Sequence, residues 1–320
     1  MEWLVYVLFV IGFVFLIKGA DLLVDGSVSI AGRLRISNLV IGLTVVAFGT
    51  SLPELLVNLV ASFEGSTDIA IGNILGSNIA NILLILGIAS IIYPLSVKKN
   101  TTFKEIPFSL LAAVILAVLA NDIMIDNYSF SILSRSDGIT LLCFFAIFLY
   151  YVFTITKDSD EEQDEVKIIS LPKSIIYILV GLVGLTIGGK WIVEGAVSIA
   201  TQFGISESLI GLTIIAIGTS LPELATSAVA ALKKNTDIAI GNVVGSNIFN
   251  VFWILGISSI IKPLPFNEQS NTDLFMVIFS SLLLFAFLSF GKQRHLLHKS
   301  HGILFLSLYV AYTAYLIYRG

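Results

Sequence analysis

Two glutamates lie in parts of the sequence where an ionised carboxylate is costly to hold. Glu54 and Glu223 each sit inside a long apolar run, within the segments "AFGTSLPELL" and "AIGTSLPELA". Each glutamate follows an alanine, a threonine and a serine at spacing i, i+3, i+4 and i+7, which is one face of a helix. The two sets are Ala47, Thr50, Ser51 and Glu54, and Ala216, Thr219, Ser220 and Glu223. Inside a bilayer such carboxylates must be protonated or must hold cations.

A proline beside each glutamate interrupts the helix that carries it. Pro53 has no N–H to donate, and its ring crowds the carbonyl four residues earlier, at Gly49. We therefore expect the helix to kink or unwind around residues 49–53, and the second copy around Pro222 to do the same. Backbone carbonyls freed in this way cannot face lipid, so they must face protein, water or an ion.

A second polar motif follows each glutamate, "GNILGSNIAN" in the first case and "GNVVGSNIFN" in the second. Its asparagines and serine are spaced i, i+4 and i+8 on one helix face, and they are Asn73, Ser77 and Asn81, then Asn242, Ser246 and Asn250. Taken singly, such residues usually make hydrogen bonds between membrane helices. As a set with two carboxylates and freed carbonyls, they form an all-oxygen environment with no cationic side chain nearby in sequence.

That environment suits hard cations. Ca²⁺ takes about six to eight oxygen ligands, whereas soft metals prefer the Cys and His side chains that these segments lack. Two carboxylates are neutralised by one Ca²⁺ or by two Na⁺, so the two occupancies exclude each other. Mutually exclusive occupancy of one site is the physical basis of antiport.

The elements that must position these residues are membrane helices. The chain has 320 residues, of which 56% are hydrophobic and 12% charged, about half the charged fraction of a soluble domain. Recurring apolar runs predict an all-α polytopic membrane protein. We expect ten transmembrane helices, near residues 3–24, 38–62, 68–95, 104–121, 136–156, 172–193, 208–232, 237–261, 272–290 and 301–318. There is no basic stripe with interleaved aromatics, so nucleic-acid binding is not expected.

The two halves of the chain are one sequence used twice. Residues 36–95 and 205–264 align at an offset of 169 with 37 identities in 60 positions. The expected organisation is a first five-helix repeat over 1–156, an acidic linker over 157–171 and a second repeat over 172–320. An odd number of spans per half makes the second repeat enter the membrane from the opposite side. This is the inverted-repeat plan of secondary transporters, with the site near the midplane.

The basic residues predict an orientation. Loops after the odd-numbered spans carry thirteen Lys and Arg, and the opposite loops carry four, namely Arg135, Lys190, Lys262 and Arg319. By the positive-inside rule, both termini of this multi-pass protein face outside the cell membrane and the linker 157–171 is cytoplasmic. No cofactor and no protein partner are indicated; the expected partners are Ca²⁺, Na⁺ and the lipid bilayer.

At these motifs the chain resembles the cation/Ca²⁺ exchanger superfamily, and within it the prokaryotic sodium/calcium exchangers. The resemblance rests on "GTSLPE" with "GNILGSNIAN" and "GTSLPE" with "GNVVGSNIFN" and covers nearly the whole chain. It implies ten helices, alternating access around four central ion sites, and one Ca²⁺ exchanged for several Na⁺, commonly three. Such an exchange is electrogenic.

The resemblance also implies roles for individual residues. Glu54 and Glu223 correspond to Ca²⁺ ligands, together with the carbonyls of Thr50 and Thr219. Ser51, Ser77 and the Ala47 carbonyl correspond to one Na⁺ site, and the mirror site has Ser220, Ser246 and the Ala216 carbonyl. Asn81 and Asn250 flank the middle. Some relatives carry an aspartate in place of Asn250, which bears on K⁺ involvement and on the number of Na⁺ exchanged.

Three other functions are compatible with parts of the pattern. A Ca²⁺/H⁺ exchanger would use the glutamates to trade Ca²⁺ for protons, but proton-coupled relatives typically have "GNxxE" where this chain has "GTSLPE". A cation channel would use carboxylates for selectivity, but duplicated broken helices fit alternating access better. An intramembrane enzyme would need a nucleophile and base beside each other, and the glutamates lie on ion-ligand faces instead. We therefore expect a transporter rather than an enzyme.

Overall fold

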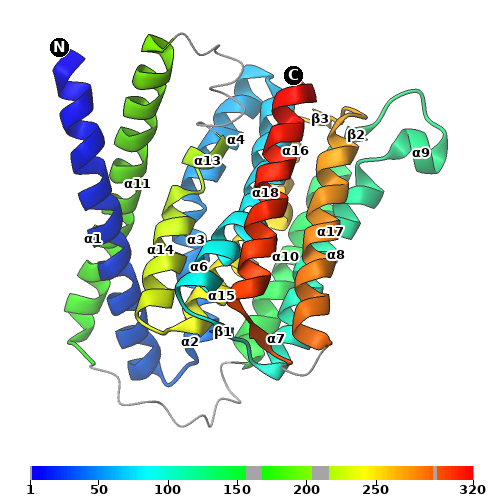
Figure 1. The fold of residues 1–320 in the computed structure, drawn as a ribbon. Coiled ribbons are helices and arrows are strands. Elements are labelled where there is room, and N and C mark those ends of the chain that lie inside the picture. The colour runs from blue at the N-terminus through cyan, green and yellow to red at the C-terminus, as the bar shows by residue number, and fades with distance from the viewer. Residues whose placement is uncertain (1, 156–167, 204–215, 291–293, 320) are drawn as a thin grey trace.

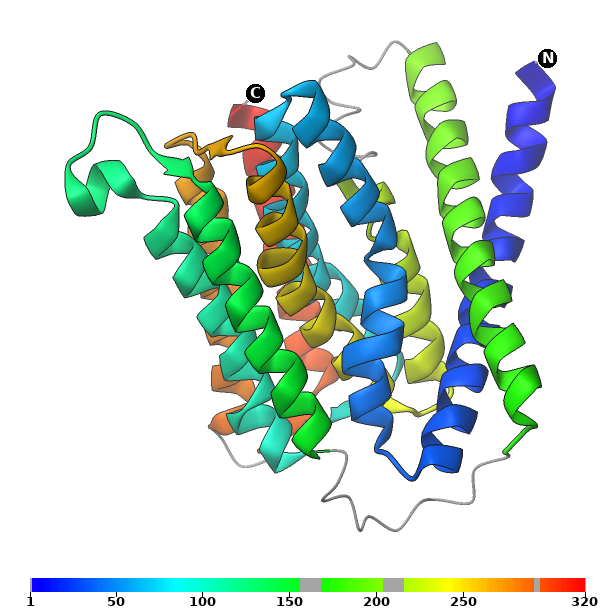
Figure 2. The ribbon, with the colours of Figure 1, turned by 180° about the vertical axis from the view of Figure 1, so that it is seen from behind.

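The computed structural model describes residues 2–155, 168–203, 216–290 and 294–319, and these residues are almost entirely helical. The first half contains α1 (Glu2–Leu34), α2 (Asn38–Ile41), η1 (Gly42–Val46), α3 (Ala47–Thr50), α4 (Leu52–Glu64), α5 (Thr67–Ile79), η2 (Ala80–Ile85), α6 (Leu86–Ile92), β1 (Leu95–Ser96), α7 (Lys99–Phe103), α8 (Glu105–Leu119), α9 (Asp122–Asp126), β2 (Ile132–Leu133) and α10 (Arg135–Ile155). The second half contains α11 (Leu171–Gln202), α13 (Ala216–Gly218), α14 (Leu221–Leu232), α15 (Thr236–Ile248), η4 (Phe249–Leu255), α16 (Gly256–Ile261), β3 (Leu264–Pro265), α17 (Ser270–Ser289), β4 (Leu296–Leu297) and α18 (Lys299–Arg319). Figures 1 and 2 show them as one bundle.

Apolar helices lie at the predicted spans that the structure describes, although α1 and α11 are longer than predicted. Eight helices of the described residues are long and apolar enough to cross a membrane, and the bent pair Asn38–Thr50 and Leu52–Glu64 makes a ninth. The predicted span 208–232 is described only from residue 216, as α13 and the short apolar helix α14. Most of the predicted linker, residues 157–167, also lies outside the described residues.

The pair formed by α1 and α11 stands at one side of the bundle (Figure 1). Gly12 lies against Gly188, and Gly19 against Gly181, so the two helices run antiparallel. A Cβ atom on Gly19 would meet the Gly181 carbonyl oxygen at 2.8 Å, a distance too short for a side chain. The small residues therefore allow the backbones to touch, as they do in many membrane helix pairs.

Both helices of this pair are longer than the sequence predicts. The apolar stretches ended near residues 24 and 193, whereas α1 contains 33 residues and α11 contains 32. Two charged residues near the predicted end of α1 are paired with another element. Lys233, at the end of α14, lies 2.6 Å from a carboxylate oxygen of Asp21 and 2.6 Å from one of Asp25. Hydropathy does not register charges that are neutralised by another element.

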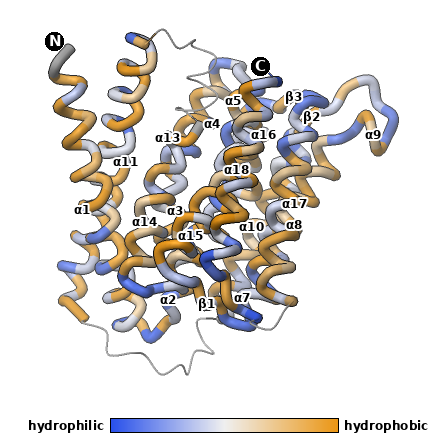
Figure 3. Tube along the Cα trace, viewed as in Figure 1, coloured by the Kyte–Doolittle hydropathy of each residue, from blue (hydrophilic) through white to orange (hydrophobic). Residues whose placement is uncertain are grey.

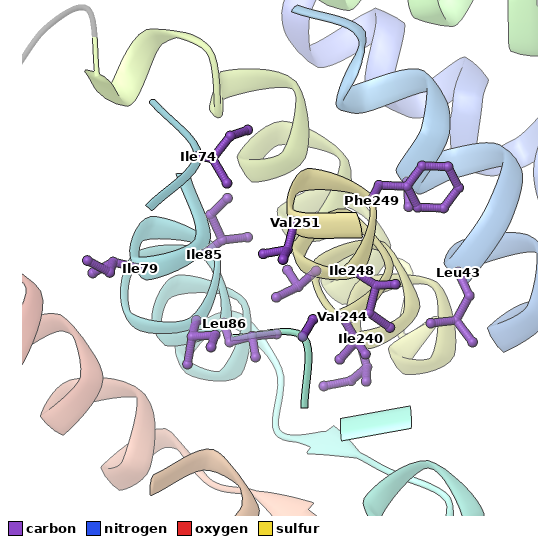
Figure 4. Close-up of a cluster of buried hydrophobic side chains, with 14 of the residues drawn as sticks. Leu43, Ile74, Ile79, Ile85, Leu86, Ile240, Val244, Ile248, Phe249 and Val251 are labelled. Carbon is purple, nitrogen blue, oxygen red and sulfur yellow. The ribbon is translucent and has the colours of Figure 1, made fainter. Parts of the chain in front are cut away.

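The centre of the bundle consists of two continuous spans, residues 67–92 and 236–261. Each is 78% buried within its most apolar stretch, whereas the other long spans are 17–39% buried. Figure 4 shows the apolar side chains between them, among them Ile74, Ile85 and Val251. These side chains pack against protein, whereas the outer helices carry exposed apolar residues such as Val14, Tyr150 and Val310. Figure 3 shows that hydrophobic residues predominate along these helices. The motifs "GNILGSNIAN" and "GNVVGSNIFN" therefore lie on the two most buried spans.

Two short β ladders join the halves at opposite ends of the bundle (Figure 1). β1 pairs antiparallel with β4, with Leu95 opposite Leu297, and β2 pairs antiparallel with β3, with Leu133 opposite Leu264. Each ladder takes one strand from each half of the chain. At one end the strand that follows α6 of the first half pairs with a strand of the second half. At the other end the strand that follows α16 of the second half pairs with a strand of the first half.

Candidate cation site

The helix that carries Glu54 is broken one turn before it. α3 ends at Thr50 and α4 begins at Leu52, and the helical stretch Asn38–Thr50, of which α3 is the last part, is bent by 44° relative to Leu52–Glu64. Pro53 occupies the first turn of α4, where its missing N–H is tolerated. In the second half, α13 ends at Gly218, α14 begins at Leu221, and Pro222 again lies in the first turn. The predicted interruption is confirmed in both copies.

The two glutamates are buried and bonded by serines from both halves. Glu54 and Glu223 are each 1% exposed. Oε1 of Glu54 accepts hydrogen bonds from Ser77 (3.4 Å) and Ser220 (3.5 Å). Oε1 of Glu223 accepts hydrogen bonds from Ser246 (3.4 Å) and Ser51 (3.2 Å). Each carboxylate is thus contacted by its own half and by the other half.

The threonines of the two motifs also reach across. The Thr50 hydroxyl donates to Oδ1 of Asn242 at 3.0 Å, and the Thr219 hydroxyl donates to Oδ1 of Asn73 at 3.4 Å. Asn242 in turn donates to the Glu223 main-chain carbonyl oxygen, and Asn73 to that of Glu54. The break before α4 is therefore hydrogen-bonded to α15, and the break before α14 is hydrogen-bonded to α5.

The alanines lie where the sequence places them, at the start of each break. The Ala47 carbonyl oxygen accepts hydrogen bonds from the Ser51 N–H at 3.0 Å and from the Thr50 hydroxyl at 3.4 Å. Ala216 is the first residue of α13. In the second half, the glycines of "GNVVGSNIFN" allow close helix contact, because Gly241 and Gly245 lie against Gly42, Leu43 and Ala47.

Asn81 and Asn250 lie one turn beyond the serines, each as the second residue of a π-helical segment, η2 and η4. Segments of this kind often occur at functional sites. The Asn81 amide nitrogen donates to Oδ1 of Asn247, and the Asn250 amide nitrogen donates to Oδ1 of Asn78, both at 2.9 Å. Our sequence analysis did not single out Asn78 and Asn247. The signal was present, because "GSN" occurs in both motifs.

Four acceptor oxygens at this centre have no hydrogen-bond partner among the described residues: Oε2 of Glu54, Oε2 of Glu223, Oδ1 of Asn81 and Oδ1 of Asn250. Buried polar atoms are normally satisfied, so this group of orphaned oxygens is unusual. All four atoms are carboxylate or amide oxygens, whose lone pairs can coordinate a cation. Within the described residues no group of three or more His, Cys, Asp or Glu side chains gathers as a metal centre. The arrangement instead suits hard cations held by carboxylate, amide and hydroxyl oxygens.

The fold is that of a multi-pass membrane protein, and these buried oxygens form its candidate cation site. Comparisons with known proteins identify the family. The family model for sodium/calcium exchanger proteins matches residues 4–154 and 173–318. A sodium/calcium exchanger of Methanosarcina acetivorans, MaX1, is 33% identical over 352 residues, covering 98% of each chain. A sodium/potassium/calcium exchanger of Rattus norvegicus is 36% identical over 122 residues, which is 36% of this chain and 18% of that one.

A solved structure of the sodium–calcium exchanger NCX_Mj, soaked with Na⁺ and Sr²⁺, superposes with a TM-score of 0.85. It is 37% identical in sequence, and the match covers 98% of this chain and 99% of that one. The chain therefore belongs to the sodium/calcium exchanger family.

Proposed function

We propose that this protein is a secondary antiporter that exchanges Ca²⁺ for several Na⁺ by alternating access. The observation that carries the proposal is the pair of buried carboxylates, each with one oxygen bonded by serines of both halves and one oxygen without a partner among the described residues. Two negative charges are balanced by one Ca²⁺ or by two Na⁺, with hydroxyl and amide oxygens available for a further Na⁺. Exchange of more than two Na⁺ for one Ca²⁺ moves net charge.

The site residues take the following roles in this proposal. Glu54 and Glu223, with the carbonyls of Thr50 and Thr219, hold Ca²⁺. The serines and alanine carbonyls form two flanking Na⁺ sites, one of Ser51, Ser77 and Ala47, the other of Ser220, Ser246 and Ala216. Asn81 and Asn250 supply oxygens in the middle. Support comes from the orphaned oxygens of the two glutamates and the two asparagines.

The proposal includes ten transmembrane helices in two inverted five-helix repeats, over 1–156 and 172–320, joined by the linker 157–171. The antiparallel contact of α1 with α11 and the β ladders at opposite ends favour this plan. The first helix of each repeat moves against the remaining bundle to open the site to alternate sides. With both termini outside the cell membrane and the linker in the cytoplasm, the proposal also fixes the orientation.

Transport in liposomes tests the function. Purified protein is reconstituted into Na⁺-loaded liposomes, the liposomes are diluted into Na⁺-free buffer, and uptake of radioactive Ca²⁺ is followed. Uptake should require internal Na⁺. An inside-positive potential should accelerate it and an inside-negative potential should slow it, because more positive charge leaves with Na⁺ than enters with Ca²⁺.

Two controls separate the alternatives. Uptake that ignores Na⁺ but follows an outward proton gradient would replace this proposal with a Ca²⁺/H⁺ exchanger. Replacing K⁺ by choline on both sides should leave the rate unchanged, because the site has two carboxylates to neutralise rather than three. A K⁺ requirement would contradict this charge count.

A further inference from the structure

Two asparagines, Asn78 and Asn247, connect the halves of the molecule through hydrogen bonds to each other's main chain. The Asn78 amide nitrogen donates to the main-chain carbonyl oxygen of Asn247 at 3.4 Å, and the Asn247 amide nitrogen donates to that of Asn78 at 3.5 Å. A main-chain carbonyl can only accept, so it selects the NH₂ end of each amide. The opposite end of each side chain, Oδ1, is therefore turned away from the backbone of the other helix.

These fixed oxygens determine the orientation of a second pair of amides. Oδ1 of Asn78 can only accept, and it receives the amide nitrogen of Asn250 at 2.9 Å. Oδ1 of Asn247 receives the amide nitrogen of Asn81 at 2.9 Å. Because Asn81 and Asn250 are held by their nitrogens, their Oδ1 atoms are the ends left without a partner among the described residues. All four side chains are at most 2% exposed, so water does not compete for these bonds.

We infer that Asn78 and Asn247 are positioning residues that determine which end of the Asn250 and Asn81 amides is presented to the transported cation. The inference rests on the proposed function, in which Asn81 and Asn250 supply oxygens to the middle of the site. An asparagine amide has nearly the same shape in its two orientations, and packing alone selects neither. Turned by 180°, it would present two N–H donors to a cation and repel it.

The main-chain carbonyls thus orient the amides of Asn78 and Asn247. These two amides in turn orient those of Asn250 and Asn81. Supporting groups that orient ligands typically change metal affinity roughly 10–100-fold when they are lost. The inference also assigns each supporting residue to one ligand. Asn78 orients Asn250 and not Asn81, and Asn247 orients Asn81 and not Asn250. This cross-assignment is what an experiment can test.

The experiment measures equilibrium binding of Ca²⁺ to purified protein, with Asn78→Ala introduced into three backgrounds: wild type, Asn250→Ala and Asn81→Ala. In wild type we expect affinity to fall roughly tenfold or more. In the Asn250→Ala background we expect no further loss, because no amide remains for Asn78 to orient. In the Asn81→Ala background the full loss should appear. Asn247→Ala should give the converse pattern.

Asn121→Ala is the matched control, because Asn121 is a buried asparagine whose amide nitrogen donates to the Ala117 carbonyl oxygen at 2.9 Å, away from the site. Its Ca²⁺ affinity should equal that of wild type. Asn78→Leu, which keeps the branched skeleton of the side chain but has neither a donor nor an acceptor, replaces Asn78→Ala if the alanine variant does not fold. Unfolding temperature is measured for every variant, since a purely structural role would lower stability in both backgrounds alike.

Equal losses in the Asn250→Ala and Asn81→Ala backgrounds would overturn the inference and leave the proposed function standing. Wild-type protein that neither binds Ca²⁺ nor exchanges it for Na⁺ would instead overturn the proposed function. The two failures are therefore distinguishable.

Discussion

Glu54 and Glu223 are the residues on which the proposed exchange depends most directly. In Glu54→Gln or Glu223→Gln, the amide fits the same space but removes one of the two negative charges that balance Ca²⁺. A hydrogen bond or ligand contact to a charged group contributes up to about 3 kcal/mol, which corresponds to roughly a 100-fold loss of Ca²⁺ affinity. Na⁺-driven Ca²⁺ uptake in liposomes should fall to background.

Glu105→Gln is the matched control for these two variants. Glu105 is also a buried carboxylate, 1% exposed, but its hydrogen-bond partner among the described residues is the Tyr151 hydroxyl and not a serine of the site. Its uptake should remain near that of wild type. Wild-type Ca²⁺ uptake in both Glu54→Gln and Glu223→Gln would remove the glutamates from the site.

Asn250→Asp tests the charge balance from the other direction. It places a third carboxylate where the structure has an amide oxygen without a partner among the described residues. One Ca²⁺ would then leave a residual charge of −1, so a proton or a monovalent cation must enter as well. We expect Ca²⁺ uptake by this variant to depend on pH or on K⁺ while the wild-type rate does not. Identical pH and K⁺ profiles for the two proteins would contradict a middle position for Asn250.

At the scale of elements, the contact between α1 and α11 has no room for added atoms. In Gly19→Ala the new Cβ would lie 2.8 Å from the Gly181 carbonyl oxygen, so one backbone must move. Overpacking of this kind typically costs about 1–3 kcal/mol. The unfolding temperature in detergent should fall.

Gly189→Ala provides the comparison, because its Cβ would meet its nearest neighbour, the Leu221 side chain, at 3.9 Å. The unfolding temperature of this variant should stay level or rise, since alanine favours a helix over glycine by about 1 kcal/mol. A fall equal to that of Gly19→Ala would indicate that close backbone contact does not determine the stability of the pair.

Much of this arrangement follows from local sequence, and some of it does not. Pro53 and Pro222 predict the two breaks because a missing N–H acts within one turn of helix. The length of α1 was underestimated because Lys233, which neutralises Asp21 and Asp25, lies more than two hundred residues away. Asn78 and Asn247 were missed for a similar reason. Their function depends on a contact with the other half, which periodicity cannot express.

At the scale of the whole molecule, the two ends of the bundle should be accessible from opposite sides of the membrane. The helices α7 and α9 lie at opposite ends of the bundle (Figure 1). Asn100 is an exposed residue of α7, and Tyr128 is an exposed residue two positions after α9. In a Cys143→Ala background, Tyr128→Cys should react with an impermeant maleimide added to intact cells. Asn100→Cys should react only after the membrane is opened. The reverse pattern would place the termini in the cytoplasm.

The contacts between the halves run in both directions. Ser51 bonds Glu223 while its equivalent Ser220 bonds Glu54. Reciprocal contacts between two copies of one sequence have the geometry of a symmetric homodimer. An ancestral polypeptide of half this length would have needed a second copy of itself to assemble both carboxylates around one ion. Fusion of the copies then allowed each to diverge.

The ion pair between Lys233 and Asp21 records that divergence. The positions equivalent to these two, 169 residues away, are Glu64 and Lys190, so the charges have exchanged sign. In a homodimer both copies must keep the same residue at each position, and this exchange is impossible. The two halves could thus evolve separately, although residues 36–95 and 205–264 are copies of one sequence.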